Sequence, residues 1–177
     1  GLRRPLSCVW PEADADAHEG RLVLWVGDKP MSKVKPRPWP LTAKGRVNLF
    51  EAFPIGTDQR GRPVSLTVMF ASMVIGAVPR MGKTFTLRLI LLAAALDVRA
   101  ELHVYDLKGG ADLRALAQVA HRFRIGDEDE DLTYVMDDLR AVREDMSRRY
   151  KVIRSLPEDI CPEGKVTFDL ATRKNLG

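Results

Sequence analysis

The sequence Ala77-Val78-Pro79-Arg80-Met81-Gly82-Lys83-Thr84 determines the fold that we expect for this chain. The apolar run Met73–Gly76 precedes it, and Phe85–Leu92, which we expect to be helical, follows it. A strand, a glycine turn and a helix in this order are typical of a phosphate-binding loop, because the free N–H groups and the dipole of the helix attract an anion. We therefore predict a buried strand over residues 73–76 and a nucleotide site at the start of the helix.

Two residues of this loop have a defined chemical role in the expected site. Lys83 is expected to reach the β- and γ-phosphates of ATP as a point charge, and the Thr84 hydroxyl is expected to ligate Mg²⁺. We therefore assign Lys83 and Thr84 as the catalytic residues, Thr84 as the metal ligand, and ATP and Mg²⁺ as the cofactors. The residues expected to bind the nucleotide are Ala77, Val78, Pro79, Arg80, Met81, Gly82, Lys83, Thr84 and Phe85.

Three residues make the loop unusual. Ala77 stands where the pattern G-x-x-x-x-G-K-[ST] has its first glycine, and Pro79 removes one N–H group that could face a phosphate. Arg80, at the tip, either adds a cation beside the nucleotide or points to solvent. Two alternatives therefore stay open: a strand, turn and helix that bind no nucleotide, and a loop that keeps the fold without hydrolysing ATP.

Length and composition are those of one domain of ordinary size. The chain has 177 residues, of which 45% are hydrophobic, and this is enough to build a core. The longest apolar run, Val68–Val78, is too short for a bilayer, and no signal-peptide pattern opens the chain. Cys8 and Cys161 lie far apart without metal-binding or redox spacing, so we expect reduced thiols in a cytoplasmic protein. The net charge of +4 permits a nucleic-acid partner but does not argue for one.

Residues 1–45 are predicted to form an N-terminal segment with one strand candidate, Arg21–Val26. The acidic group Asp14, Asp16, His18 and Glu19 could form a metal site, but we favour a solvated loop because alternation with alanine fixes no geometry. Lys33–Pro40 is rich in proline and typical of a linker. Six basic residues and no acid lie between Lys29 and Arg46, with Trp39 among them. They could follow a nucleic-acid backbone, but we favour the plain linker.

From Val47 onward, strand and helix patterns alternate, which predicts a mainly parallel sheet covered on both faces. The expected elements are a strand pair over 53–64, a helix over 87–96 that is buried on all sides, a strand over 101–105, a short helix carrying Leu113, Leu116, Ala117 and Ala120, and a strand over 121–125. A long helix should follow the acidic residues 127–131 and stop at Pro157. Its apolar face consists of Leu132, Val135, Met136, Leu139, Val142, Met146, Tyr150 and Ile153.

Asp106 ends the strand over 101–105 and is a further candidate site residue. Its position resembles that of the acid that holds Mg²⁺ through water in P-loop enzymes. No glutamate follows it, however, and the next residues are Leu107-Lys108-Gly109-Gly110. The alternative is that Asp106 caps this glycine turn.

A series of sequence blocks resembles the motor domain of the FtsK/SpoIIIE family, whose members are ATP-driven translocases of double-stranded DNA. The blocks are Pro54–Asp58, Gly61–Val64, the phosphate loop, Val104–Gly110, Met146–Tyr150 and Thr172–Asn175. The form of Gly76–Thr84 is most similar to the actinobacterial branch, which includes conjugative plasmid-transfer proteins. The resemblance covers about residues 47 to 177, and the ordered series is more specific than the loop alone.

The resemblance implies an α/β fold with a three-layer, RecA-like P-loop NTPase core. Residues 46–177 would be the N-terminal part of this motor domain, and residues 1–45 a short segment that precedes it, with β structure and a Pro-rich linker. It also implies chromosome segregation or plasmid transfer by a homo-oligomeric ring, usually a hexamer. Double-stranded DNA would be held by later parts of the domain, and upstream membrane segments would place the whole protein at the cytoplasmic face of the membrane.

The family's Walker B strand, with its acidic pair, normally follows the Arg-Lys-Asn region, where this chain ends. The chain also starts at Gly1 rather than Met and stops at Gly177 without a closing element, so we expect a fragment. We expect it to bind ATP, whereas hydrolysis requires a carboxylate that positions the attacking water.

Two other classes of protein compete with a DNA motor. A small-molecule kinase also needs a phosphate loop, and the charged helix over 129–156 could be its lid, although Leu107–Gly110 has no place in that scheme. A non-catalytic interaction module is the other alternative. The basic residues Arg148, Arg149 and Lys151 could face DNA or a neighbouring subunit, but we favour a solvated surface because Glu144 and Asp145 lie four residues before the two arginines.

Overall fold

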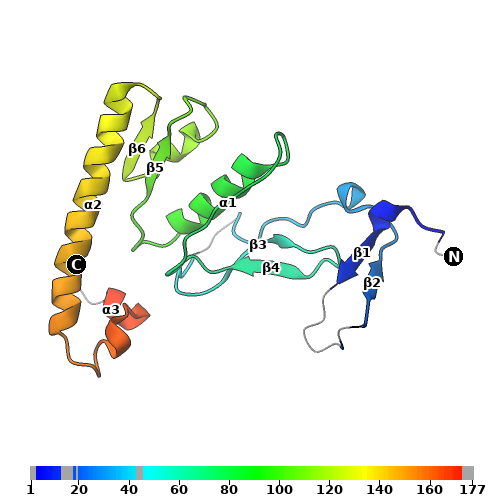
Figure 1. Ribbon diagram of the computed structural model, residues 1–177, viewed down its shortest axis with the longest axis horizontal. Helices are drawn as coiled ribbons and strands as arrows, with labels where there is room; N and C mark the ends of the chain where they lie inside the picture. Colours follow the sequence, from blue (N-terminus) through cyan, green and yellow to red (C-terminus); the bar gives the residue numbers. More distant parts are fainter. Residues whose placement is uncertain (1–2, 13–17, 19, 43–45, 173–177) are drawn as a thin grey trace. The chain divides into compact units, whose positions relative to one another are not determined.

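The computed structural model describes residues 3–12, 18, 20–42 and 46–172 of the chain (Figure 1). The chain divides into two compact units. The first, the hairpin unit, comprises residues 1–44 and 54–66, and the second, the helical unit, comprises residues 45–53 and 67–177.

The hairpin unit begins with an antiparallel strand pair in which Trp10 lies opposite Trp25. The two indole ring centroids are 5.2 Å apart. The second strand, β2 (Val23–Val26), lies within the predicted strand Arg21–Val26, whereas β1 (Val9–Glu12) was not predicted. The sequence did not predict β1 because the strand contains Pro11, and proline has no backbone N–H group to donate to a neighbouring strand. Two short 3₁₀ helices flank this pair: η1 (Leu6–Cys8) and η2 (Met31–Lys33).

A second strand pair is formed by β3 (Phe53–Thr57) and β4 (Pro63–Leu66). The Asp58 carboxylate closes the turn by accepting the N–H groups of Arg60 and Arg62, at 2.9 and 2.8 Å. Gly61 has a φ of 77°, which glycine adopts without steric cost. The predicted order of strand, glycine turn and strand is confirmed.

Trp39 anchors the Pro-rich segment within the hairpin unit. Its ring N–H donates to the carbonyl of Pro54 at 2.8 Å, and the side chain is half-buried. A packed indole with a bound N–H is poorly placed to stack on bases. The structure therefore favours the linker interpretation of this segment over the nucleic-acid one.

The helical unit contains a parallel strand pair, β5 (His103–Asp106) and β6 (Arg122–Ile125), with His103 opposite Arg122. Both strands were predicted from the sequence and are confirmed. The connection is a 3₁₀ helix, η3 (Arg114–Gln118), where an α-helix was expected. Leu113 and Leu116 are both buried, and a spacing of three residues places them on one side of a 3₁₀ turn.

Helix α1 (Lys83–Ala95) packs on one side of this strand pair through Leu87, Leu91 and Ala94. The core beneath it consists of Leu102, Val104, Leu113 and Leu116. The prediction that this helix is buried on all sides is wrong for the described residues, because only Ala93 of α1 is fully buried. The side chains of Phe85 and Leu92 are exposed.

Helix α2 (Asp129–Ser155) lies on the opposite side of β5 and β6 from α1 (Figure 1). Alternate residues of a strand point to opposite faces, so Val104 faces α1 whereas His103 and Tyr105 face α2. A capping box between Glu128 and Asp131 begins the helix. It ends two residues before Pro157, as predicted, and is followed by η4 (Pro162–Gly164) and α3 (Phe168–Thr172).

Arg99 ties three distant segments of the helical unit together. Its guanidinium binds the Asp97 carboxylate at 2.7 and 2.8 Å and the Asn48 side-chain oxygen at 2.9 Å. It also lies over the rings of Phe50 and Phe168, 5.4 and 4.5 Å from their centroids. This contact joins residues 48–50, the segment after α1, and α3.

The strand predicted over Met73–Gly76 is absent, because residues 71–78 carry no secondary structure. Val74 is 98% exposed. An apolar segment becomes a strand only beside a hydrogen-bonded neighbour, and in the described part of the chain β5 and β6 pair only with each other. The three-layer P-loop core therefore stays a prediction; the described strands form three separate two-stranded sheets, of which β5–β6 is parallel.

Candidate functional site

The loop before α1 turns sharply through two residues with left-handed backbone conformations. Arg80 has a φ of 65° and Gly82 a φ of 82°, and the N–H of Met81 donates to the carbonyl of Val78 at 3.3 Å. A Cβ atom added at Gly82 would meet nothing within 4 Å, so backbone conformation rather than crowding favours glycine here.

The first turn of α1 presents uncapped N–H groups. Its N-cap residue is Gly82, which has no side chain to accept a hydrogen bond. The Gly82 carbonyl instead accepts the N–H and the hydroxyl of Thr86, at 3.0 and 3.3 Å. The N-terminal end of this helix therefore keeps the donors and the positive dipole end that an anion requires.

The side chains of the predicted site lie at or near the surface. Lys83 and Arg80 are exposed, and Thr84 is half-buried. Within the described residues, neither basic side chain has a carboxylate within ion-pair distance. Both charges are therefore available to an anionic ligand.

Asp106 caps the glycine turn that follows β5. Its carboxylate accepts the N–H of Lys108 at 3.2 Å, and Gly109 has the left-handed φ of 71°. A Cβ atom added at Gly110 would lie 3.2 Å from the Asp106 carboxylate. Asp106 therefore caps the turn, which is the alternative that the sequence left open. The hydrogen bond from Lys108 occupies one of its two carboxylate oxygens.

The basic residues of α2 are partly paired with acids of the same helix. Asp145 binds Arg148 at 2.6 Å and Arg149 at 2.5 Å, and the hydrogen bond from Arg148, then that from Arg149, lowers the pKa of Asp145. The predicted Asp145–Arg149 pair is confirmed, whereas Arg148 binds Asp145 rather than Glu144. Lys151 has no ion pair among the described residues and lines an open hollow of about 520 Å³ with Arg140, Arg143, Glu144, Ser147 and Arg148.

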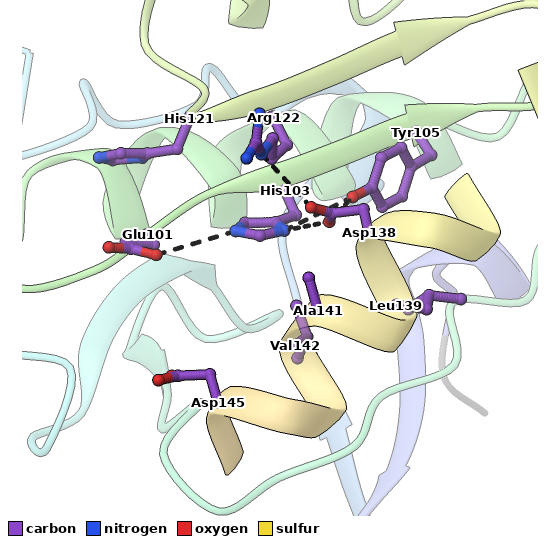
Figure 2. Close-up of a pocket in the computed structure, with 10 residues that line it drawn as sticks. All are labelled: Glu101, His103, Tyr105, His121, Arg122, Asp138, Leu139, Ala141, Val142 and Asp145. Atoms are coloured by element: carbon purple, nitrogen blue, oxygen red, sulfur yellow. Dashed lines mark hydrogen bonds and ion pairs between the residues drawn. The ribbon is translucent and has the colours of Figure 1, made fainter. Parts of the chain in front are cut away.

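A polar cluster that the sequence did not predict lies between β5, β6 and α2 (Figure 2). The Asp138 carboxylate accepts hydrogen bonds from the Tyr105 hydroxyl and from His103 Nδ1, the latter at 2.5 Å. Arg122 Nε lies 3.4 Å from the other carboxylate oxygen, and His103 Nε2 lies 3.9 Å from Glu101. Figure 2 shows these groups pointing toward one another beside a cavity of about 790 Å³.

The protonation of this cluster follows from burial and hydrogen bonding. Burial would raise the pKa of Asp138, but the hydrogen bonds from Tyr105 and His103 outweigh it and hold the pKa below its ordinary value. Burial, followed by the hydrogen bond to Asp138, raises the pKa of the Tyr105 phenol. Asp138 is therefore ionised and its oxygens are occupied, so the cluster fastens α2 to the sheet and leaves no free buried carboxylate for catalysis.

A signal for this cluster does exist in the sequence. Asp138 interrupts the apolar face of the long helix, three residues after Val135 and four before Val142. Asp131, seven residues earlier, is also buried and binds Arg124 of β6 at 2.5 Å. Acids within an apolar helix face indicate polar partners on the neighbouring element.

Several predicted features cannot be placed. Asp14, Asp16 and Glu19 of the acidic group, and Arg173–Asn175 of the last sequence block, lie outside the described residues. In the described part, no three metal-ligating side chains gather to hold an ion. None of the helices described there combines the length and the apolar content that crossing a membrane requires.

Comparisons with known proteins assign no family. No protein-family model, no curated protein and no solved structure matches this chain.

Proposed function

We propose that this chain is the ATP-binding portion of an ATP-driven translocase of double-stranded DNA. The observation that carries the proposal is the loop Ala77–Gly82, which turns through a left-handed Gly82 into the uncapped N-terminus of α1. Lys83 and Thr84 stand in the first turn of that helix. The order of sequence blocks that resembles the FtsK/SpoIIIE family adds the DNA-motor part of the proposal.

The residues of the loop fit the phosphates of a nucleotide. The N–H groups of the first turn have no side-chain cap, and Lys83 is exposed without an ion-pair partner in the described part of the chain. In the proposal, these N–H groups and Lys83 bind the phosphates, and the Thr84 hydroxyl contributes a ligand to Mg²⁺. Bound Mg²⁺ would neutralise charge on the β- and γ-phosphates.

Lys83 is the sharpest test of nucleotide binding. Lys83→Ala should weaken ATP binding by about 1.5–3 kcal/mol, because a charge-assisted contact to the phosphates is lost. Isothermal titration calorimetry with and without Mg²⁺ measures the change. Lys151→Ala is the matched control, since it removes another exposed lysine, which lies on α2, and should leave ATP affinity unchanged.

Two results would contradict the assignment. If Lys83→Ala binds ATP as tightly as the parent chain under the same Mg²⁺ concentration, the loop does not hold the phosphates. If the parent chain binds no ATP at all, the non-catalytic interaction module is the better description, and Ala77 and Pro79 are the residues that explain the loss. Turnover by this chain without DNA, with a small molecule accepting the phosphate, would favour the kinase.

A further inference from the structure

The surplus of positive charge in this chain belongs to one of its two units. Residues 1–44 and 54–66, which form the hairpin unit, contain ten Lys and Arg residues against six Asp and Glu residues. The helical unit contains eighteen of each. The whole net charge of +4 therefore lies in the hairpin unit, and an anionic partner would complement it.

The unpaired part of this charge is concentrated around the 3₁₀ helix η2. Four basic side chains there are exposed: Lys29, Lys33, Lys35 and Arg37. In the described part of the chain, none of the four has a carboxylate within ion-pair distance. The sequence contains no acid within residues 29–46. Asp28, directly before this run, binds Arg4 at 2.9 Å.

Arg37 also lies beside the turn between β3 and β4. One of its guanidinium nitrogens is 3.7 Å from the position that a Cβ atom at Gly61 would occupy. The acids near this turn, Glu12 and Asp58, already bind arginines of the turn itself. Trp39 holds this end of the segment in place through its hydrogen bond to β3. The basic run is therefore held on the hairpin unit, and the acids near the turn have arginine partners of their own.

Two exposed apolar side chains stand among the basic ones. Met31 is 42% and Val34 56% exposed. The N–H of Val34 donates to the carbonyl of Met31 at 3.0 Å, and residues three apart in a 3₁₀ turn lie on the same side of it. This turn therefore presents an apolar pair, with lysines before, between and after the pair in the sequence.

This combination fits a lipid surface better than a nucleic acid. Both partners offer phosphates to basic side chains, but only a bilayer also offers an apolar layer to Met31 and Val34. A nucleic acid offers base stacking instead. Trp39, the one aromatic residue within residues 29–46, is half-buried and hydrogen-bonded. Clusters of about four to eight Lys and Arg residues are typical of surfaces that bind anionic lipids.

We propose that residues 29–37 form a docking surface for a membrane that contains anionic lipids. The basic side chains pair with the headgroups, and Met31 and Val34 enter the boundary between headgroups and acyl chains. The hairpin unit thereby binds at the membrane surface without spanning the bilayer. This inference is independent of nucleotide binding, because the phosphate loop belongs to the helical unit.

Vesicle sedimentation with the 177-residue chain tests the proposal. One set of vesicles contains phosphatidylcholine alone, and the other contains about 30% phosphatidylserine as its anionic lipid. The chain should bind the anionic vesicles at least about tenfold more tightly than the neutral ones, and added salt should reduce the difference.

Two double variants at exposed positions separate the basic from the apolar contribution. Lys33→Gln with Lys35→Gln should weaken binding to the anionic vesicles by about 25-fold, because each basic residue near such a surface contributes roughly a factor of five. Met31→Ser with Val34→Ser should weaken binding by about fivefold or more, since the apolar contact is lost. Lys108→Gln is the matched control: it removes an exposed lysine of the helical unit and should leave vesicle binding unchanged.

Three results would overturn the proposal. The first is equal binding to neutral and anionic vesicles, or binding to neither. The second is a variant with Met31→Ser and Val34→Ser that binds the anionic vesicles as tightly as the parent chain. The third is binding to a linear DNA duplex but not to the anionic vesicles, weakened by Lys33→Gln with Lys35→Gln, which would make a nucleic acid the partner of this surface.

Discussion

Thr84 is the residue that separates a magnesium–nucleotide site from an ordinary helix start. Its side chain is half-buried in the first turn of α1. Thr84→Val keeps the shape and removes the hydroxyl, whereas Thr84→Ser keeps the hydroxyl. We expect Mg²⁺ to strengthen ATP binding by the parent chain and by Thr84→Ser, but much less by Thr84→Val, as measured by calorimetry. If ATP binding depends on Mg²⁺ equally in both variants, Thr84 is not a metal ligand and only begins the helix.

Asp97 is the residue whose titration should be visible in the stability of the fold. The hydrogen bond from Arg99 lowers the pKa of Asp97 from 3.8 to about 2, against the opposing effect of burial. Because the folded-state pKa is depressed, the stabilisation is fully present above about pH 4 and is lost as the pH falls through about 2. Urea unfolding between pH 6 and pH 2 should show this loss.

Asp97→Asn should remove that part of the pH dependence and cost on the order of 3 kcal/mol at neutral pH, because it leaves the Arg99 guanidinium without its carboxylate. Asp145→Asn is the control, since its pairs with Arg148 and Arg149 are exposed and should contribute less than about 1 kcal/mol. Equal effects of the two substitutions would show that Arg99 does not organise the helical unit.

At the scale of elements, α2 is fastened to the strand pair by buried carboxylates more than by its apolar residues. Asp131 binds Arg124, and Asp138 binds His103, Tyr105 and Arg122. Asp138→Asn should lower the free energy of unfolding by about 1–3 kcal/mol, because an amide cannot satisfy all three donors. Amide hydrogen exchange should speed up in α2 before it does so in α1.

The neighbouring residue supplies the matched control for this element. Asp137 lies one position earlier, is exposed, and pairs only with Arg140 at 2.7 Å among the described residues. Asp137→Asn should change stability by less than about 0.5 kcal/mol. If the two variants have the same stability and the same exchange pattern, α2 is held by other contacts.

At the scale of the whole molecule, the proposed motor requires more than the loop. Binding needs the phosphate site, whereas hydrolysis also needs a positioned carboxylate, and in the described part of the chain Asp106 is engaged in capping its own turn. We expect a full-length protein containing this chain to hydrolyse ATP faster with linear duplex DNA, and the 177-residue chain alone to show little turnover. A phosphate-release assay on both, with and without duplex, measures this. An absence of stimulation by duplex in the full-length protein would argue against a translocase.

By itself, the sequence determined the local elements of this protein. The strand–turn–strand of β3 and β4, the strands β5 and β6, and the start and stop of α2 follow from side-chain period, glycine turns and proline, which act over a few residues. The turn through Arg80 and Gly82 into α1 belongs to this group, whereas phosphate binding by that turn stays a prediction. The sequence did not predict elements correctly where they depend on a neighbour: β1 contains a proline that its edge position tolerates, and Met73–Gly76 has no strand beside it in the described part of the chain.

Only the tertiary structure decided which distant side chains meet. His103 and Asp138 are 35 residues apart in the chain, and Arg99 and Asn48 are 51 residues apart. It also decided that Trp39 is packed within its unit and that Leu139, Val142 and Met146 of α2 are exposed although the residue pattern places them on its apolar face. The physical reason is that burial and hydrogen bonding between distant segments depend on how the elements pack. The local pattern of residues specifies which apolar and polar side chains each element presents, but not which other element they contact.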